Sequence, residues 1–163
     1  MTIRPSRTVL TGCCVLLMSS GAIDLPSAWS ESKVKVNPCT LLTETDFKKA
    51  TGTGLSPYGR LIPEEFGRDS VVCHYSGAGG VDVEVILGPG YPKENFEKAI
   101  KKEERVTGIG DVASLREQRD QVALEALVGR YSMRLGLQSD GMPAKPLKEI
   151  AVELAKVAME KLR

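Results

Sequence analysis

The first thirty residues have the order of a secretory signal, and this feature limits what the rest of the chain can fold into. Arg4 and Arg7 precede a short apolar stretch at 13–18, and Ala28 and Ser30 are the small residues of a cleavage site. The apolar stretch is too short to span a bilayer, which needs roughly 20 apolar residues. We therefore expect a signal peptide at 1–30 and export to the periplasm or the medium.

Within this leader, Leu10-Thr11-Gly12-Cys13 has the form of a lipobox, where a bacterial lipoprotein is cut and acylated on cysteine. The peptidase needs an apolar segment in the membrane before the cut, whereas here the apolar run follows Cys13. A lipid anchor at Cys13, which would make the protein a membrane-anchored lipoprotein, is kept as the alternative to a free exported protein.

Removal of the leader leaves about 133 residues, a length that suits one domain with a single core. Twenty basic and twenty acidic residues remain in this part. Binding to a nucleic acid needs clustered cations that displace phosphate counterions, and the basic residues here are interleaved with acidic ones. We therefore expect no nucleic-acid partner.

Two cysteines, Cys39 and Cys73, remain once Cys13 and Cys14 leave with the leader. In an oxidising compartment such a pair is typical of a structural disulfide. Closing a loop of about 35 residues would stabilise the fold by roughly 4 kcal/mol. Two alternatives remain: a redox pair, although the C-x-x-C spacing is missing, and metal ligation, although further ligands are scarce.

His74 is the single histidine of the chain, so a multi-histidine metal site is excluded. Its place in a predicted strand directs it to the face opposite Cys73 and Tyr75. If the cysteine faces the core, the histidine is exposed or lies under a helix, with a functional role as the alternative. We expect no metal and no cofactor.

The first half of the folded part predicts a helix and a hairpin. Thr43 is a candidate N-cap with Asp46 three residues later, and Gly52 sits where helices commonly end. Residues 71–75 and 81–87 predict two strands, because 81–87 alternates apolar and polar side chains and a glycine-rich connection precedes it.

The second half predicts a helix over 92–105, with Phe96, Ala99 and Ile100 facing inward, and strands at 112–115, 121–128 and 131–137. A last helix at 147–162 carries apolar residues at helical spacing. The order αββαβββα predicts an α+β fold, a twisted antiparallel sheet with helices packed on it. We expect a single domain at 38–163 after a polar run-in at 31–37.

Residues 52–69 are rich in glycine and proline and predict a long loop. Long loops in compact domains are often functional. The loop is therefore a candidate binding loop through its larger side chains, with a packed surface loop held by the disulfide as the alternative; the side chains are Tyr58, Arg60, Leu61, Ile62 and Phe66.

The segment Gly108-Ile109-Gly110-Asp111 has the outline of a phosphate-binding loop. It lacks a third glycine, and neither a preceding strand nor a following helix is evident. We expect a structural turn in which the Asp111 carboxylate accepts hydrogen bonds from backbone N–H groups.

Three short motifs carry a resemblance to a known family. They are Pro-Cys-Thr-Leu-Leu at 38–42, Cys-His-Tyr at 73–75 and Gly-Ile-Gly-Asp-Val-Ala at 108–113. On these motifs the chain resembles exported domains of unknown function found mostly in actinobacterial lipoproteins, over residues 38–162. The resemblance implies a Cys39–Cys73 disulfide and an antiparallel sheet with helices, and it implies no catalytic residues.

Taken together, these features predict an exported cell-envelope protein that acts as a non-enzymatic binding or accessory module. Its partner would be an envelope protein or a small ligand, bound by the 52–69 loop or by a sheet face. One alternative is a hydrolase-type enzyme whose Ser/Lys pair or carboxylates (Glu64, Glu65, Asp69, Asp111) converge only in the fold. Another is a structural assembly factor.

Overall fold

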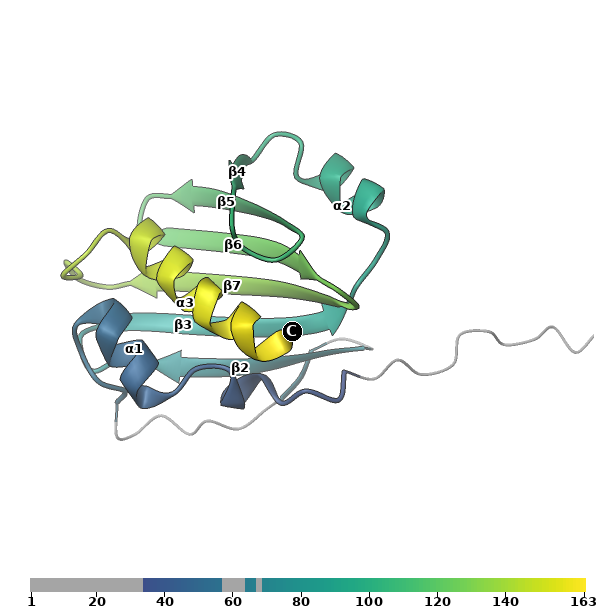
Figure 1. Cartoon of the computed structure of the whole chain (residues 1–163). Coiled ribbons are helices and arrows are strands. Elements are labelled where there is room, and N and C mark those ends of the chain that lie inside the picture. Colours follow the sequence, from purple (N-terminus) through teal and green to yellow (C-terminus); the bar gives the residue numbers. More distant parts are fainter. Residues whose placement is uncertain (1–33, 57–63, 67–68) are drawn as a thin grey trace, which may run out of the picture. The chain divides into compact units, whose positions relative to one another are not determined.

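An antiparallel sheet organises the residues that the structure describes. The computed structural model describes residues 34–56, 64–66 and 69–163, with the backbone alone at 65 and 66. Within these residues, seven strands form one sheet in the order β1-β2-β3-β7-β6-β5-β4 (Figure 1). The strands are β1 Glu64–Phe66, β2 Ser70–Ser76, β3 Val81–Pro89, β4 Glu104–Val106, β5 Val112–Gln118, β6 Gln121–Val128 and β7 Tyr131–Ser139.

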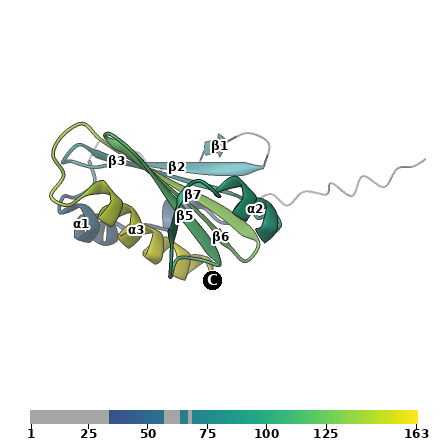
Figure 2. The same cartoon turned by 90° about the horizontal axis from the view of Figure 1, so that it is seen from above.

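Helices pack on this sheet, so the predicted α+β fold in a single domain is confirmed. The helices are the short 3-10 helix η1 Pro38–Thr40, α1 Glu44–Thr51, α2 Lys93–Ala99 and α3 Leu147–Leu162. Figure 2 shows α1 and α3 on the same side of the sheet.

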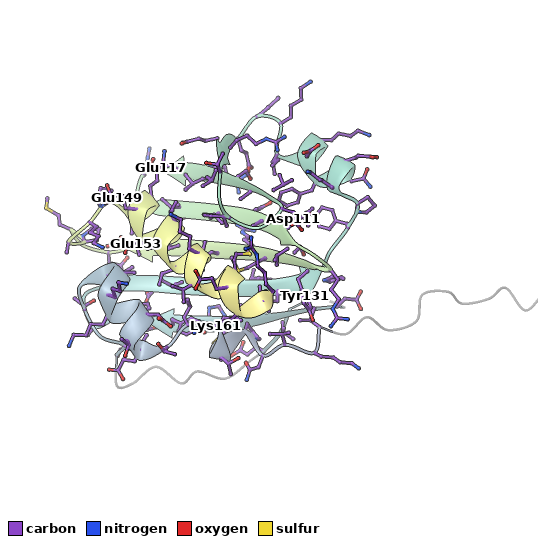
Figure 3. The ribbon with its side chains drawn as sticks, viewed as in Figure 1. Asp111, Glu117, Tyr131, Glu149, Glu153 and Lys161 are labelled. Atoms are coloured by element: carbon purple, nitrogen blue, oxygen red, sulfur yellow. A yellow bond between two sulfur atoms is a disulfide. The ribbon has the colours of Figure 1, made fainter. Side chains whose placement is uncertain are left out.

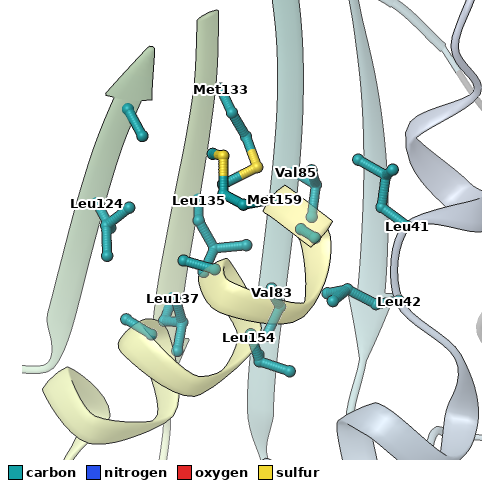
Figure 4. Close-up of a cluster of buried hydrophobic side chains, with 14 of the residues drawn as sticks. Leu41, Leu42, Val83, Val85, Leu124, Met133, Leu135, Leu137, Leu154 and Met159 are labelled. Atoms are coloured by element: carbon teal, nitrogen blue, oxygen red, sulfur yellow. The ribbon is translucent and has the colours of Figure 1, made fainter. Parts of the chain in front are cut away.

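The core lies between the sheet and α3. Successive side chains of a strand point to opposite faces, and one set from each central strand meets the helix. Leu135 and Leu124 of the sheet and Leu154 of α3 are fully buried in this layer (Figure 4). The buried stripe of α3 is made of Ile150, Ala151, Leu154, Ala155, Ala158 and Met159. Burial of each large aliphatic side chain here stabilises the fold by about 1.5–3 kcal/mol.

The capping residues predicted for α1 form both of their hydrogen bonds. The Asp46 N–H donates to Thr43 Oγ1 at 3.2 Å, and the Thr43 N–H donates to Asp46 Oδ2 at 2.9 Å. Lys161 Nζ of α3 also donates to Asp46 Oδ2, at 3.0 Å. The Thr43 N–H, followed by the Thr43 hydroxyl and then by Lys161, therefore holds the pKa of Asp46 below its usual value. Gly52 ends the helix at φ 80°, in the left-handed region.

A disulfide and a hydrogen bond attach η1 to β2. Cys39 and Cys73 are bonded, as predicted, with Cα atoms 5.2 Å apart. Two residues along β2, the Tyr75 hydroxyl donates to the Pro38 carbonyl at 2.7 Å. Tyr75 is completely buried, and burial raises its pKa to about 12. The start of the described chain is thus fastened to the core side of β2.

The helix predicted over 92–105 is wrong in its second half. α2 ends at Ala99, which is exposed rather than inward-facing, and 104–106 form the edge strand β4. Strand β4 pairs with β5, so its backbone groups find hydrogen-bonding partners that a sequence pattern does not reveal. The tertiary pairing overrides the helical propensity of the Lys/Glu-rich segment.

The loop predicted over 52–69 is also partly wrong. Glu64–Phe66 form the edge strand β1, paired with β2, and Leu55 makes an isolated bridge to Gly77. A three-residue strand leaves almost no periodic signal, so only its pairing with β2 identifies it.

Candidate functional site

The sheet face opposite α3 is only partly covered by the helices that the structure describes. At one end, Phe96 of α2 and Ile100, which follows the helix, pack against Val112 and Leu127. At the other end, outward-facing side chains of β2, β3, β7, β6 and β5 line a groove of about 410 Å³. This volume falls within the range of small-molecule pockets, roughly 300–1,000 Å³. We call this feature the polar groove.

Two small residues form the floor of the polar groove. Gly136 of β7 pairs in register with Glu84 of β3 on one side and with Ala123 of β6 on the other. Ala123 pairs in turn with Arg116 of β5. A Cβ atom placed on Gly136 would lie 3.8 Å from both Cβ and Oε1 of Glu84, which are ordinary contact distances, so a side chain added here fits beside the Glu84 carboxylate. Glycine weakens a strand interior and often marks close approach by another molecule.

The acidic side of the polar groove comes from β3, which contributes Asp82 and Glu84. Glu84 Oε2 lies 3.6 Å from Nδ1 of His74, the neighbouring residue on β2. These two side chains are 37% and 53% exposed, so their pair contributes at most about 1 kcal/mol even with a protonated histidine. Such a weak pair leaves the Glu84 carboxylate available to a ligand.

The basic side comes from Arg116 of β5 and Arg134 of β7. The nearest acidic partner of Arg116 is Glu103, with Nη1 3.8 Å from Oε1. Arg134 faces Glu125 in register, and Glu84 is its diagonal neighbour. Neither carboxylate comes within 4.0 Å of it, and Arg134 has no hydrogen bond or ion pair with the residues that the structure describes. Its guanidinium therefore offers all its donors to a ligand.

Amide side chains form one rim of the polar groove. Gln118, Gln121 and Gln138 come from three adjacent strands and lie in one row across the sheet. Gln121 Nε2 donates to Gln138 Oε1 at 3.4 Å. Each amide carries donors and an acceptor, so this rim can bond both N–H and C=O groups of a bound molecule.

The groove can bind polar molecules, but it does not hold an assembled nucleophile. Ser76 and His74 lie two residues apart on β2 and face the same side, and no hydrogen bond joins their side chains. A serine nucleophile needs a base within hydrogen-bonding reach, about 2.6–3.2 Å. Among the described residues, no three His, Cys, Asp or Glu side chains are grouped closely enough to hold a metal ion.

Most of the binding loop predicted from sequence lies outside the described residues. This is the case for Tyr58, Arg60, Leu61 and Ile62, and for the side chain of Phe66 in β1. The predicted signal peptide, the lipobox cysteine Cys13 and the polar residues 31–33 lie outside them as well. Among the helices that are described, none is long and apolar enough to cross a membrane.

The predicted turn at 108–111 has a structural role. The Asp111 carboxylate accepts a hydrogen bond from the Gly129 N–H at 2.7 Å, and the Asp111 N–H donates to the Leu127 carbonyl at 2.7 Å. The turn before β5 is thereby tied to the β6–β7 turn. A side chain on Gly110, at φ 57°, would collide with the Leu127 carbonyl, whereas Gly108 has open space around it.

The carboxylates named in the enzyme alternative do not converge. Glu64 and Glu65 belong to β1 at one edge of the sheet, and Asp69 follows them just before β2. Asp111 precedes β5, and four strand positions along the order separate β5 from β2. Strands lie about 4.8 Å apart, so Asp111 is roughly 20 Å from the other three groups, which lie together at the β1–β2 edge. Figure 3 shows Asp111 and Glu117 at opposite ends of β5.

Sequence reasoning singled out His74 of the polar groove but missed Glu84, Arg116, Arg134 and Gly136. His74 points away from Cys73 and Tyr75, as predicted, and it is exposed. One sequence signal pointed to this region: Gly136 lies in the middle of an apolar strand pattern, and a glycine in such a place often marks where a ligand or another backbone comes close to the strand. The neighbours of Gly136 belong to other strands, so their assembly needed the register of the sheet.

Comparison with known proteins adds no relative to this description: no family model, no curated protein and no solved structure matches the chain. The fold and the polar groove are therefore the basis for assigning a function.

Proposed function

We propose that the protein is an exported, non-enzymatic binding module that holds a small polar ligand in the polar groove. The observation that carries this proposal is the unpartnered guanidinium of Arg134 beside the bare floor at Gly136. An exposed charged group that forms no ion pair with the described residues contributes little to folding. It is well placed to bond a ligand that lies over the glycine.

Export is supported by the leader at 1–30 and by the Cys39–Cys73 disulfide, because disulfides persist in oxidising compartments. The disulfide holds the core side of β2, and His74 on the same strand faces the groove. The bond thus steadies one wall of the proposed site. A free exported protein is proposed over a lipid-anchored one, because the apolar run of the leader follows Cys13 instead of preceding it.

Filling the floor of the groove tests the proposed function. Gly136→Leu adds a side chain where a Cβ atom fits, so the variant is expected to fold while its side chain occupies the groove. The matched control is Ala99→Leu, which adds the same bulk to an exposed position on α2.

The measurement is a set of ¹H–¹⁵N spectra recorded with a panel of amino acids, short peptides, dicarboxylates, polyamines and monosaccharides. We expect at least one compound class to shift amide signals of β3, β5, β6 and β7 in the wild type and in Ala99→Leu, but not in Gly136→Leu. Absence of groove shifts with every class, or equal shifts in the filled variant, would contradict the proposed function.

A further inference from the structure

We infer that the polar groove takes a short zwitterionic peptide of about three to four residues, recognised by its two charged ends and its main chain. The inference rests on the proposed function and names the ligand class of the same site. The amino terminus would lie at Asp82 and Glu84 on β3, and the carboxyl terminus at Arg116 on β5. Arg134, between them, would donate to a peptide carbonyl.

The distribution of charge favours a ligand with both signs. The groove carries two carboxylates on β3 and two guanidinium groups on β5 and β7, so its formal charge is balanced when His74 is neutral. A purely anionic ligand would be attracted by the arginines and repelled by Asp82 and Glu84, and a cation would meet the reverse. A zwitterion satisfies both sides, and its orientation is set by the charges.

The separation of the charged sides favours a peptide over a free amino acid. From Glu84 on β3 to Arg116 on β5, the register passes through Gly136 and Ala123, which makes three strand spacings. At about 4.8 Å each, these spacings place the two Cα atoms roughly 14 Å apart. An extended peptide advances about 3.4 Å per residue, so three to four residues span the groove. A single amino acid bound at Asp82 and Glu84 would be too short to reach Arg116 with its carboxylate.

The lining of the groove favours recognition of a main chain. Gly136 and Ala123 carry no side chain larger than a methyl group, so a backbone can lie close to the sheet between the Glu84 carboxylate, which reaches to beside Gly136, and Arg116. The rim amides of Gln118, Gln121 and Gln138 supply donors and acceptors that match peptide N–H and C=O groups. Because the charged and amide groups that line the groove match the ends and the main chain of a peptide, glycine peptides are suitable probes.

The test titrates the full oxidised protein with tetraglycine, N-acetyl-tetraglycine, tetraglycine amide and diglycine, using isothermal titration calorimetry. Loss of one charged contact is expected to weaken binding about tenfold, so each blocked peptide and diglycine should bind about tenfold more weakly than tetraglycine.

Variants assign each terminus to its side chain. In the double variant Asp82→Asn/Glu84→Gln, the acetylated and free peptides should bind equally, because Glu84→Gln alone leaves the Asp82 carboxylate for the amino group. In Arg116→Gln, the amidated and free peptides should bind equally. The matched control is Arg105→Gln. Arg105 is 50% exposed and 3.8 Å from Glu97, much as Arg116 is 48% exposed and 3.8 Å from Glu103, but it does not line the groove. Arg105→Gln should keep the tenfold preference for the free carboxylate.

Three results would overturn the inference: equal binding of free tetraglycine and either singly blocked peptide, equal binding of diglycine and tetraglycine, or no tetraglycine binding. Tetraglycine could fail to bind while another compound class shifts the groove signals in the wild type but not in Gly136→Leu. In that case the proposed function stands and the peptide inference falls. If no class shifts those signals, both fail.

Discussion

Removal of the Cys39–Cys73 disulfide is expected to lower the free energy of unfolding by about 4 kcal/mol. The two cysteines are 34 residues apart in sequence. Cross-linking a loop of that length removes about 12–13 cal/mol/K of entropy from the unfolded chain, which is about 4 kcal/mol at 25 °C. A domain of this size is typically stable by only 5–15 kcal/mol, so the loss is a large share of the total. Cys73→Ala adds a smaller packing cost, because Cys73 is completely buried.

The assay is urea unfolding followed by far-ultraviolet circular dichroism, applied to the oxidised wild type, both single Cys→Ala variants and the double variant. Each single substitution already breaks the bond, so the double variant should lose little more than either single one. The coupling energy between the two sites should therefore be close to the whole effect. Additive losses, or a double variant within about 1 kcal/mol of the oxidised wild type, would refute the loop-entropy argument.

The same bond should resist reduction in the folded protein. The Cys73 side chain is fully buried and Cys39 is half-buried, so attack on the Cys73 sulfur requires β2 and η1 to open locally and attack on the Cys39 sulfur is restricted. The reduction rate in dithiothreitol should rise with urea well below the unfolding midpoint. A rate that does not depend on urea would show that the sulfur atoms are reached without opening.

Three further predictions concern backbone strain and pH. In urea unfolding, Gly110→Ala should lower the free energy of unfolding by about 3 kcal/mol, because the added Cβ atom collides with the Leu127 carbonyl. The control Gly108→Ala, which is also at positive φ but has open space around it, should lower it by about 1 kcal/mol. Equal losses would contradict the collision. Arg119 has φ 46° in the β5–β6 turn, and Arg119→Gly should raise the Tm and stabilise by about 0.5–1 kcal/mol; a lower Tm would contradict this strain. Burial raises the pKa of Tyr75 to about 12, so the Tyr75 hydroxyl ionises in the unfolded chain before it ionises in the folded protein as the pH rises above 10. The free energy of unfolding should therefore fall by up to about 2–3 kcal/mol between pH 10 and 12. Stability measured over this interval should be flatter in Tyr75→Phe, and an equal fall in both proteins would contradict the assignment.

Much of the fold could be predicted where sequence and local geometry agree. Thr43, Asp46 and Gly52 bound α1 because capping depends on residues within a few positions of one another. The hairpins were recognisable because alternation in 81–87 and 131–137 reflects one buried face. The edge strands β1 and β4 were missed because they are three residues long and gain their backbone hydrogen bonds from neighbours distant in sequence.

The sequence by itself determined the disulfide, the α+β class and the outward direction of His74. Each of these follows from cysteine content, periodicity or the two-residue repeat of a strand, all of which are local properties of the chain. The polar groove was decided only by the tertiary structure. Glu84, Arg116, Arg134 and Gly136 come from three strands, and they meet because β7 inserts between β3 and β6 in a fixed register. Register is set by how the opposite face packs against α3, and that packing depends on the whole chain at once.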